Sequence, residues 1–255
     1  MITGHMRSGT TLVRYLSCSH AQVSLGMDLG CFHGLGRFGA HNALAACRRA
    51  WTKWLHIHRY KKGRDYRSTL AALRYALIVS GYGLRRMDLV SMEQALRRVL
   101  PTARIVGDKT PSYVFRLNWF AAMEGLSIVL VYRDCRDVVA ANLMRVRART
   151  RPTRRQHEFD TAGKIAQRWV RCMELLERNE PAALAVRYED LVVDPRRELK
   201  RVGHWLEIDP GGFDEEAIAQ VHTGDIGMYL NYLTQRELSV IGETAGPTMA
   251  RYGYP

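Results

Sequence analysis

Residues 4–11, GHMRSGTT, have the residue types and the spacing of a loop that binds phosphate. Glycine recurs at positions 4 and 9, where it lets the backbone turn sharply and approach an anion closely. In nucleoside-triphosphate P-loops a lysine follows the second glycine, and a Ser or Thr that binds Mg²⁺ comes next. Here Thr10 stands in the lysine position and Thr11 in the hydroxyl position. The sequence therefore predicts phosphate binding and argues against hydrolysis of ATP or GTP.

The other residues of this loop also suit an anion. Ser8 adds a hydroxyl, and Arg7 adds a fixed positive charge with a bidentate fork. A short apolar strand, MITGH, precedes the loop, and a helix through about Ser19 follows it. The amides near Gly9 would then face an anion at the start of that helix.

Short apolar runs alternate with helical stretches along the chain. Strands are predicted at 1–5, 103–109, 127–133 and 182–188, and helices at 112–122, 134–147, 195–207 and from Thr234 onward. Strands that are apolar throughout are typical of sheets covered on both faces, and alternation with helices predicts right-handed βαβ units. We expect one domain, residues 1–255, of the α/β class: three layers with a central parallel β-sheet flanked by helices, P-loop-like.

Residues 36–100 are predicted to be mostly helical and to lie between the first strand and the next one. This stretch is long for one crossover connection. We therefore expect a helical insertion that shapes a substrate pocket.

Positive charge is concentrated in two segments. The chain carries a net charge of +13; residues 48–67 contribute +7 and residues 145–155 contribute +6, so the rest is balanced. Such clusters usually mark surfaces for anions, although a solvated face without a partner is the alternative. The first segment also contains four aromatic residues, Trp51, Trp54, Tyr60 and Tyr66. It could hold an aromatic, lipidic or anionic acceptor, or lie against an anionic membrane surface. The structural alternative is an amphipathic helix that packs its tryptophans inward.

Five cysteines without a C-x-x-C pair argue against a disulfide framework and a zinc site. No stretch approaches the ~20 apolar residues of a membrane span, and no signal peptide precedes the loop. These features lead us to expect reduced thiols and a cytoplasmic location.

Four segments together resemble the sulfotransferases that use 3′-phosphoadenosine-5′-phosphosulfate (PAPS). RSGTTL is similar to the family's 5′-phosphosulfate loop, and VLVYRDCRDVVAANLMR (129–145) is similar to its 3′-phosphate motif. GDKTP (107–111) and VRYEDLVVDPRREL (186–199) resemble two further family segments, and ARYGYP resembles the usual end of a bacterial member. The resemblance explains the missing lysine, because PAPS has no β,γ-diphosphate, and it implies no metal.

The resemblance also implies cofactor-binding roles. Residues 7–11 would bind the 5′-phosphosulfate, and Arg133 and Arg145 the 3′-phosphate of PAPS or of the product, adenosine 3′,5′-bisphosphate (PAP). The family usually has serine where Ala141 stands, so one hydrogen bond to the 3′-phosphate is in doubt. Asn142 is the candidate replacement, although neighbouring residues on a helix point about 100° apart. Tyr188 would lie beside the adenine, or it is a core tyrosine.

Arg136 and Asp137 are most simply explained as charges that pair within the first turns of a helix. This structural reading needs no ligand.

The implied reaction is in-line transfer of a sulfuryl group to a hydroxyl or amine, with a general base that accepts the proton. Arg7 would stabilise the leaving phosphate, and Lys109 matches a family lysine aimed at the sulfate, unless it is an ordinary solvated lysine. Asp28 fits the place of the base best, and His33 is the other candidate. The structural alternatives are a helix cap for Asp28 and an ordinary loop histidine for His33.

The acceptor is expected to be a small molecule, a glycoside or a lipid. Two rival classes stay open: a P-loop kinase or NTPase with a degenerate Walker A loop, and a non-catalytic basic protein that binds nucleic acid. No RNP, zinc-finger or helix-turn-helix signature supports the last class.

Overall fold

The computed structural model describes residues 1–60, 66–148 and 160–255, without the side chains of 52–60 and 66–68. Parts of both basic segments lie outside the described residues. Five parallel strands form the central sheet in the order β2-β3-β1-β4-β5. The strands are β1 (Ile2–Gly4), β2 (Val23–Met27), β3 (Ile105–Lys109), β4 (Val129–Tyr132) and β5 (Leu184–Arg187). The predicted α/β class and parallel sheet are confirmed.

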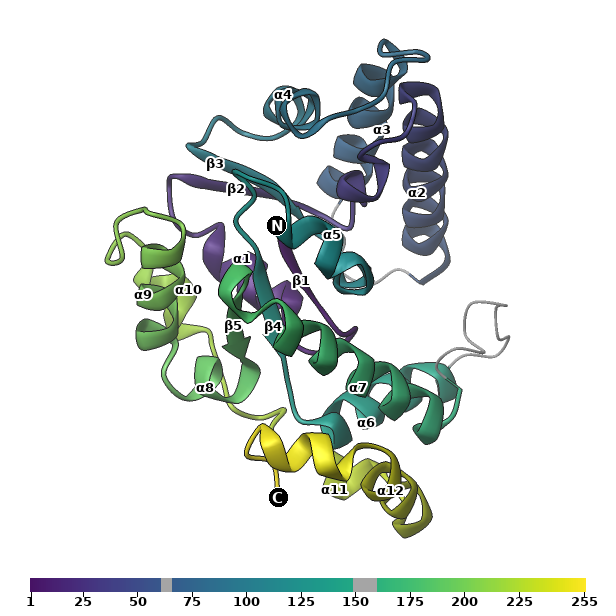
Figure 1. The fold of residues 1–255 in the computed structure, drawn as a ribbon, viewed down its shortest axis with the longest axis vertical. Helices are drawn as coiled ribbons and strands as arrows, with labels where there is room; N and C mark the ends of the chain where they lie inside the picture. Colours follow the sequence, from purple (N-terminus) through teal and green to yellow (C-terminus); the bar gives the residue numbers. More distant parts are fainter. Residues whose placement is uncertain (61–65, 149–159) are drawn as a thin grey trace.

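Helices cover both faces of the sheet (Figure 1). One face packs against α1 (Thr10–Ser17), α8 (Tyr188–Val193), α9 (Pro195–Trp205) and α10 (Glu215–Ala219). The other face carries η1 (Cys31–Gly34), α2 (Gly39–Tyr60), α3 (Tyr66–Ser80), α4 (Leu89–Val99), η2 (Pro111–Arg116), α5 (Leu117–Ala121), α6 (Cys135–Arg147), α7 (Ala162–Arg178) and α12 (Gln235–Arg251). Neighbouring residues of β4 supply both cores, since Leu130 joins one cluster and Val129 the other.

Helices α2, α3 and α4 occupy the predicted stretch 36–100, but the prediction that it directly follows the first strand was wrong. β2 follows α1 and pairs with β3 along its whole length, so the insertion of α2, α3 and α4 lies between β2 and β3. Ser24 and Gly26 interrupt the apolar run of this five-residue strand, which is why the sequence pattern did not reveal it.

Several other boundaries differ from the sequence prediction. The stretch 112–122 is divided into η2 and α5, and the amphipathic helix α7, which is buried along one side, was not predicted. The predicted strands are each shorter at one or both ends. Helix α6 agrees with prediction, and the capping box of Thr234 and Glu237 starts α12 as expected. The remaining short helices are η4 (Glu180–Ala182) and α11 (Tyr229–Tyr232).

Gly4 ends β1 in a conformation that other residues avoid. Its φ is 148°, and a Cβ built there would lie 2.1 Å from the carbonyl oxygen of Val131 on β4. The two backbones can approach so closely only because glycine has no side chain.

Gly4→Ala is therefore expected to lower the free energy of unfolding by at least about 3 kcal/mol, since both strain and a backbone clash are introduced. Chemical denaturation measures this loss. Gly242→Ala is the matched control, because nothing lies within 4 Å of its built Cβ and α12 gains a better helix former. Equal stability of the two variants would contradict the role assigned to Gly4.

Candidate functional site at the carboxyl ends of the strands

The five strand ends each carry a residue that the sequence analysis singled out. β1 leads into the loop 5–9, β3 ends at Lys109, and Asp28, Arg133 and Tyr188 follow β2, β4 and β5. Ligands of open parallel sheets bind at this edge. The structure thus brings together residues that are up to 183 positions apart, from His5 to Tyr188.

The loop after β1 has the backbone of an anion-binding turn. Arg7 and Gly9 both have left-handed backbones, with φ of 72° and 93°. Gly9 caps α1 without a side-chain hydrogen bond, and the ring of Tyr188 lies so close that a Cβ on Gly9 would be 2.3 Å from it. The Oγ of Ser8 is buried and forms no hydrogen bond with any described residue. A buried hydroxyl without a partner beside a helix N-terminus fits an oxyanion ligand.

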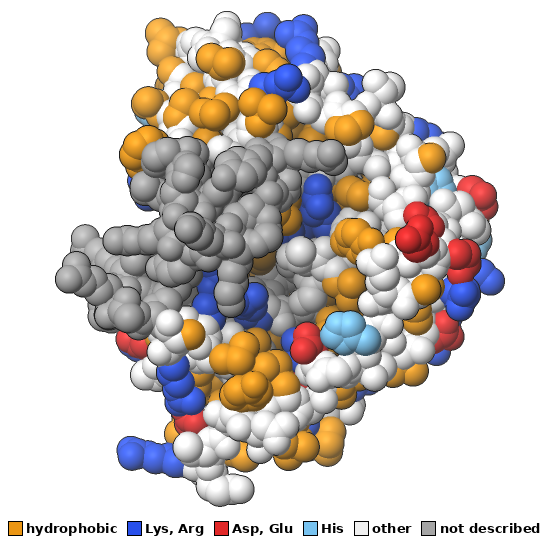
Figure 2. Space-filling view, turned by 180° about the vertical axis from the view of Figure 1, so that it is seen from behind, with side chains coloured by type: hydrophobic (Ala, Val, Ile, Leu, Met, Phe, Trp, Pro, Cys, Tyr) orange, Lys and Arg blue, Asp and Glu red, His pale blue; other side chains and the backbone are white. Residues whose placement is uncertain are grey.

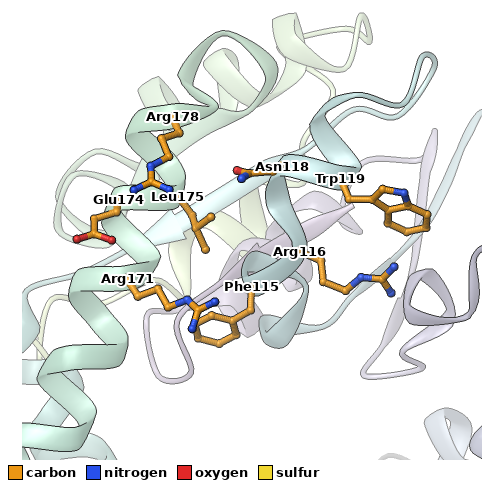
Figure 3. Close-up of a pocket in the computed structure, with 8 residues that line it drawn as sticks. All are labelled: Phe115, Arg116, Asn118, Trp119, Arg171, Glu174, Leu175 and Arg178. Carbon is orange, nitrogen blue, oxygen red and sulfur yellow. The ribbon is translucent and has the colours of Figure 1, made fainter.

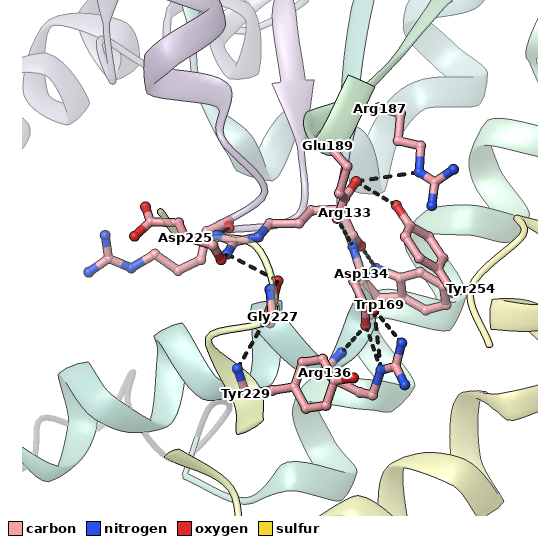
Figure 4. Close-up of polar contacts among 12 residues, drawn as sticks. Arg133, Asp134, Arg136, Trp169, Arg187, Glu189, Asp225, Gly227, Tyr229 and Tyr254 are labelled. Atoms are coloured by element: carbon pink, nitrogen blue, oxygen red, sulfur yellow. Dashed lines mark hydrogen bonds and ion pairs between the residues drawn. The ribbon is translucent and has the colours of Figure 1, made fainter. Parts of the chain in front are cut away.

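Arg133 is buried and held by protein groups (Figure 4). Its guanidinium forms an ion pair of 3.3 Å with Asp137, donates a hydrogen bond to the carbonyl of Asp225, and lies 4.5 Å from the ring centre of Tyr188. Only its Nε lacks a hydrogen-bond partner among the described residues. A phosphate at this position would compete with the Asp225 carbonyl.

Asp137 positions the segment that reaches Arg133. Its carboxylate accepts hydrogen bonds of 3.0 Å from the amides of Gly227 and Tyr229. Arg136 pairs with Asp134 at 2.6 Å and Asp137 pairs with Arg133, so both charges take partners near the start of α6, as the structural reading of the sequence predicted. The segment 225–229 was missed because no motif of the sequence analysis included it.

Glu189 joins the ends of β4 and β5 to the C-terminus. It accepts hydrogen bonds of 2.9 Å from the amide of Asp134 and from the hydroxyl of Tyr254. Arg187 lies 3.5 Å from the same carboxylate and 4.3 Å from the centre of the Tyr254 ring. The ARYGYP ending therefore braces the edge of the sheet beside Arg133.

Three residues of α6, the helix that follows Arg133, were singled out from the sequence: Ala141, Asn142 and Arg145. Asn142 is buried, and its amide nitrogen donates to the carbonyls of Val138 at 2.8 Å and Met6 at 3.3 Å. This nitrogen therefore supports the loop after β1 through Met6. Ala141 is buried, whereas Arg145 is exposed near the end of α6.

Asp28 and Lys109 form an ion pair across the ends of β2 and β3. The Lys109 ammonium lies 2.9 Å from Asp28 Oδ1; the lysine side chain is 3% exposed and the aspartate side chain 47%. Lys109 would have to share its ammonium with Asp28 in order to contact a sulfuryl group.

Asp108 organises the turn that carries Asp28. Its buried carboxylate accepts hydrogen bonds from the amides of Leu29 and Gly30, at 3.1 and 2.9 Å, and from the hydroxyls of Thr110 and Tyr113, at 2.8 and 2.5 Å. The sequence analysis missed this residue. An acidic residue inside an otherwise apolar strand was the signal that could have revealed it.

His33 lies in η1, next to this turn. Its Nε2 shares a hydrogen bond of 2.9 Å with Ser112 Oγ, and burial, followed by the charges of Arg116 and Arg49, lowers the pKa of His33 to about 4. The imidazole is neutral at pH 7, as a proton acceptor must be.

A separate pocket lies between η2–α5 and α7 (Figure 3). It has a volume of about 390 Å³ and contains none of the predicted site residues. Its lining residues are Phe115, Arg116, Asn118, Trp119, Arg171, Glu174, Leu175 and Arg178. Arg116 stacks on Trp119, with 4.2 Å to the ring centre.

Among the described residues, no three His, Cys, Asp or Glu side chains are grouped so that they could hold a metal ion. None of the helices in the same part of the chain has the length and apolar character needed to cross a bilayer.

The fold and the lysine-free loop define an α/β protein of the P-loop type. A sequence profile of the sulfotransferase family matches residues 1–213, and the chain belongs to this family, a class of transferases. No curated protein matches the sequence.

Solved structures with this fold include three bacterial sulfotransferases or sulfotransferase domains. The sulfotransferase STF9 from Mycobacterium avium has a TM-score of 0.53 and 12% identity, over 100% of this chain and 76% of that one. The sulfotransferase domain of the Synechococcus PCC 7002 olefin synthase has a TM-score of 0.52 and 18% identity, over 95% of this chain and 85% of that one. The sulfotransferase domain from the curacin biosynthetic pathway has a TM-score of 0.52 and 15% identity, over 100% of this chain and 96% of that one. At these identities the likeness supports the fold.

His5 at the start of the loop makes stability depend on pH. Burial lowers the pKa of His5 to about 4, so between about pH 6.5 and 4 the unfolded chain binds a proton that the folded protein does not. Stability should fall by up to about 3 kcal/mol as the pH drops through this window.

His5→Asn should reduce this dependence, measured as the free energy of unfolding from pH 7 to pH 4, and the part that comes from His33, whose pKa is also lowered to about 4, should stay. Exposed His222→Asn is the control and should keep the wild-type slope. An unchanged slope in His5→Asn would refute the assignment.

Proposed function

We propose that this protein transfers the sulfuryl group of PAPS to a hydroxyl or amine of a small-molecule, glycoside or lipid acceptor. The observation that carries the proposal is the loop after β1. It combines left-handed turns at Arg7 and Gly9, an unpartnered buried hydroxyl at Ser8 and no lysine, and it lies at the same sheet edge as Lys109 and Arg133.

The residues that would hold the donor fall into two groups. Residues 7–11 would bind the 5′-phosphosulfate through backbone amides, hydroxyls and the Arg7 guanidinium. Arg133 and Arg145 would bind the 3′-phosphate, and Tyr188 would lie beside the adenine. PAPS supplies an activated sulfuryl group and leaves as PAP.

The protein's own groups would stabilise charge and accept a proton. Arg7 and Lys109 would face the oxygens that gain negative charge during transfer. Asp28 is the first candidate for the base, because it is half exposed at the strand ends and touches Lys109. His33 is the second, because it is neutral at pH 7.

Thermal-shift measurements with ATP, ADP, PAP and PAPS test donor binding. PAP at about 100 times its Kd should raise the Tm by roughly 5–10 °C, since binding at that excess adds about 2.7 kcal/mol. In Arg133→Ala the shift caused by PAP and PAPS should be lost, measured against the variant's own Tm.

Arg147→Ala is the matched control, because Arg147 is an exposed arginine at the end of α6, the helix that follows Arg133, and it pairs with Glu237. It should keep the full shift. An equal PAP shift in Arg133→Ala would move the 3′ site elsewhere. Preference for ATP with Mg²⁺ would favour a kinase or NTPase, and salt-dependent oligonucleotide binding without a PAP response would favour a nucleic-acid-binding protein.

Asp28→Asn and His33→Ala distinguish the two candidate bases once an acceptor is identified. Loss of the base should lower kcat about 10²–10⁴-fold with little change in PAP affinity. If His33 is the base, kcat/KM should fall only near pH 4 and not near 6.5. Exposed Glu174→Gln serves as the carboxylate control. Full turnover in both variants would exclude both assignments.

A further inference from the structure

The outer faces of α2 and α3 expose large apolar side chains. On α3, Leu70, Leu73 and Leu77 are spaced so that they share one helical face, and Leu77 is 74% exposed. On α2, Leu44 is 71% exposed, and Trp51 is exposed two turns further on. We call these five residues, with Leu84 in the turn after α3, the leucine face. Single exposed leucines are ordinary, but a group on two packed helices marks an interaction surface.

The leucine face is not needed to hold the two helices on the protein. The opposite sides of the helices already supply core residues. These are Ala46 and Ala50 of α2 and Ala72, Tyr75, Ala76 and Val79 of α3, all part of the larger core cluster. The pair therefore has one apolar side that packs inward and a second that faces outward.

Positive charge accompanies the leucine face. Arg48 lies one helical turn from Leu44, Arg74 lies one turn from Leu70, and Arg85 follows Leu84; all three are exposed. Between positions 40 and 87 the sequence has eleven Lys and Arg against one acidic residue, Asp65. Figure 2 shows hydrophobic and basic side chains side by side over the upper part of the molecule, where these helices lie in Figure 1.

The positive charge favours an anionic membrane over a second copy of the chain as the partner of the leucine face. A second copy of the chain placed face to face would oppose arginines with arginines, at a cost in repulsion. An anionic lipid surface accepts the leucines into its interfacial region and attracts the arginines. Trp51 also belongs to the residue types that are enriched at membrane interfaces.

We propose that the leucine face docks this protein onto the surface of an anionic membrane. The two helices would lie along the surface without spanning it. Docking also has a geometric link to the site, since the guanidinium of Arg49 on α2 packs against Gly30, two residues from Asp28. The proposal needs no sulfuryl transfer, so its test is independent of the proposed function.

Co-sedimentation with lipid vesicles tests the proposal. The full chain should bind vesicles of phosphatidylcholine containing about 30 mol % phosphatidylserine, should bind pure phosphatidylcholine at least about tenfold more weakly, and should lose affinity as salt rises. The triple variant Leu70→Gln/Leu73→Gln/Leu77→Gln should bind the anionic vesicles at least about tenfold more weakly. Arg74→Gln/Arg85→Gln should reduce binding and its dependence on salt.

Val193→Gln/Leu230→Gln is the matched control, because it removes exposed apolar residues from other parts of the surface and should bind as the wild type does. Circular dichroism checks that each variant is folded, and Leu44→Gln gives a single-site test on the other helix. The proposal is overturned if the wild type ignores anionic vesicles, if it binds neutral vesicles equally well, or if the triple variant binds unchanged. A dimer in sedimentation velocity that the triple variant abolishes, without lipid binding, would assign the face to a second copy.

Discussion

Parallel strands impose one direction on the whole sheet, so every residue that follows a strand arrives at the same edge. β1 occupies the centre, with β3 and β2 on one side and β4 and β5 on the other. The loop after β1 therefore has Lys109 and Asp28 on one flank and Arg133 and Tyr188 on the other. Neither flank depends on sequence proximity to the loop. The close approach of β1 to β4 at Gly4 sets how near Arg133 can come to this loop.

Residues at strand ends could be predicted because the signal is local. An apolar run followed by a polar residue predicts both the strand and the edge at which the residue lies. Arg133 and Lys109 were located in this way, and the family resemblance added their roles. β2 was not predicted, because Ser24 and Gly26 interrupt its five residues and leave no clear hydrophobic period. All five residues nevertheless pair with β3 in the sheet.

The roles of Asp108 and Asp137 could not be predicted, because their partners lie far away in the chain. Asp108 accepts from Leu29 and Gly30, about 80 positions earlier, and Asp137 accepts from Gly227 and Tyr229, about 90 positions later. A single sequence contains no signal for such pairings. Both carboxylates are buried and accept backbone amides, so each converts a flexible turn into a fixed one.

Arg133 is a buried cation whose charge is compensated by groups of the protein itself. A guanidinium that loses water must be compensated, and Asp137 and the Asp225 carbonyl provide this within the protein. An anion that takes the place of the Asp225 carbonyl gains only the difference between two sets of hydrogen bonds, whereas a hydrogen bond to Nε, which has no partner among the described residues, is a net addition.

The insertion of α2, α3 and α4 leaves and re-enters the fold between β2 and β3, two strands that are immediate neighbours. Its length and composition can therefore diverge without shifting the register of any strand. Natural variation in this one segment can change the outer surface of the protein while the carboxyl edge of the sheet is inherited unchanged.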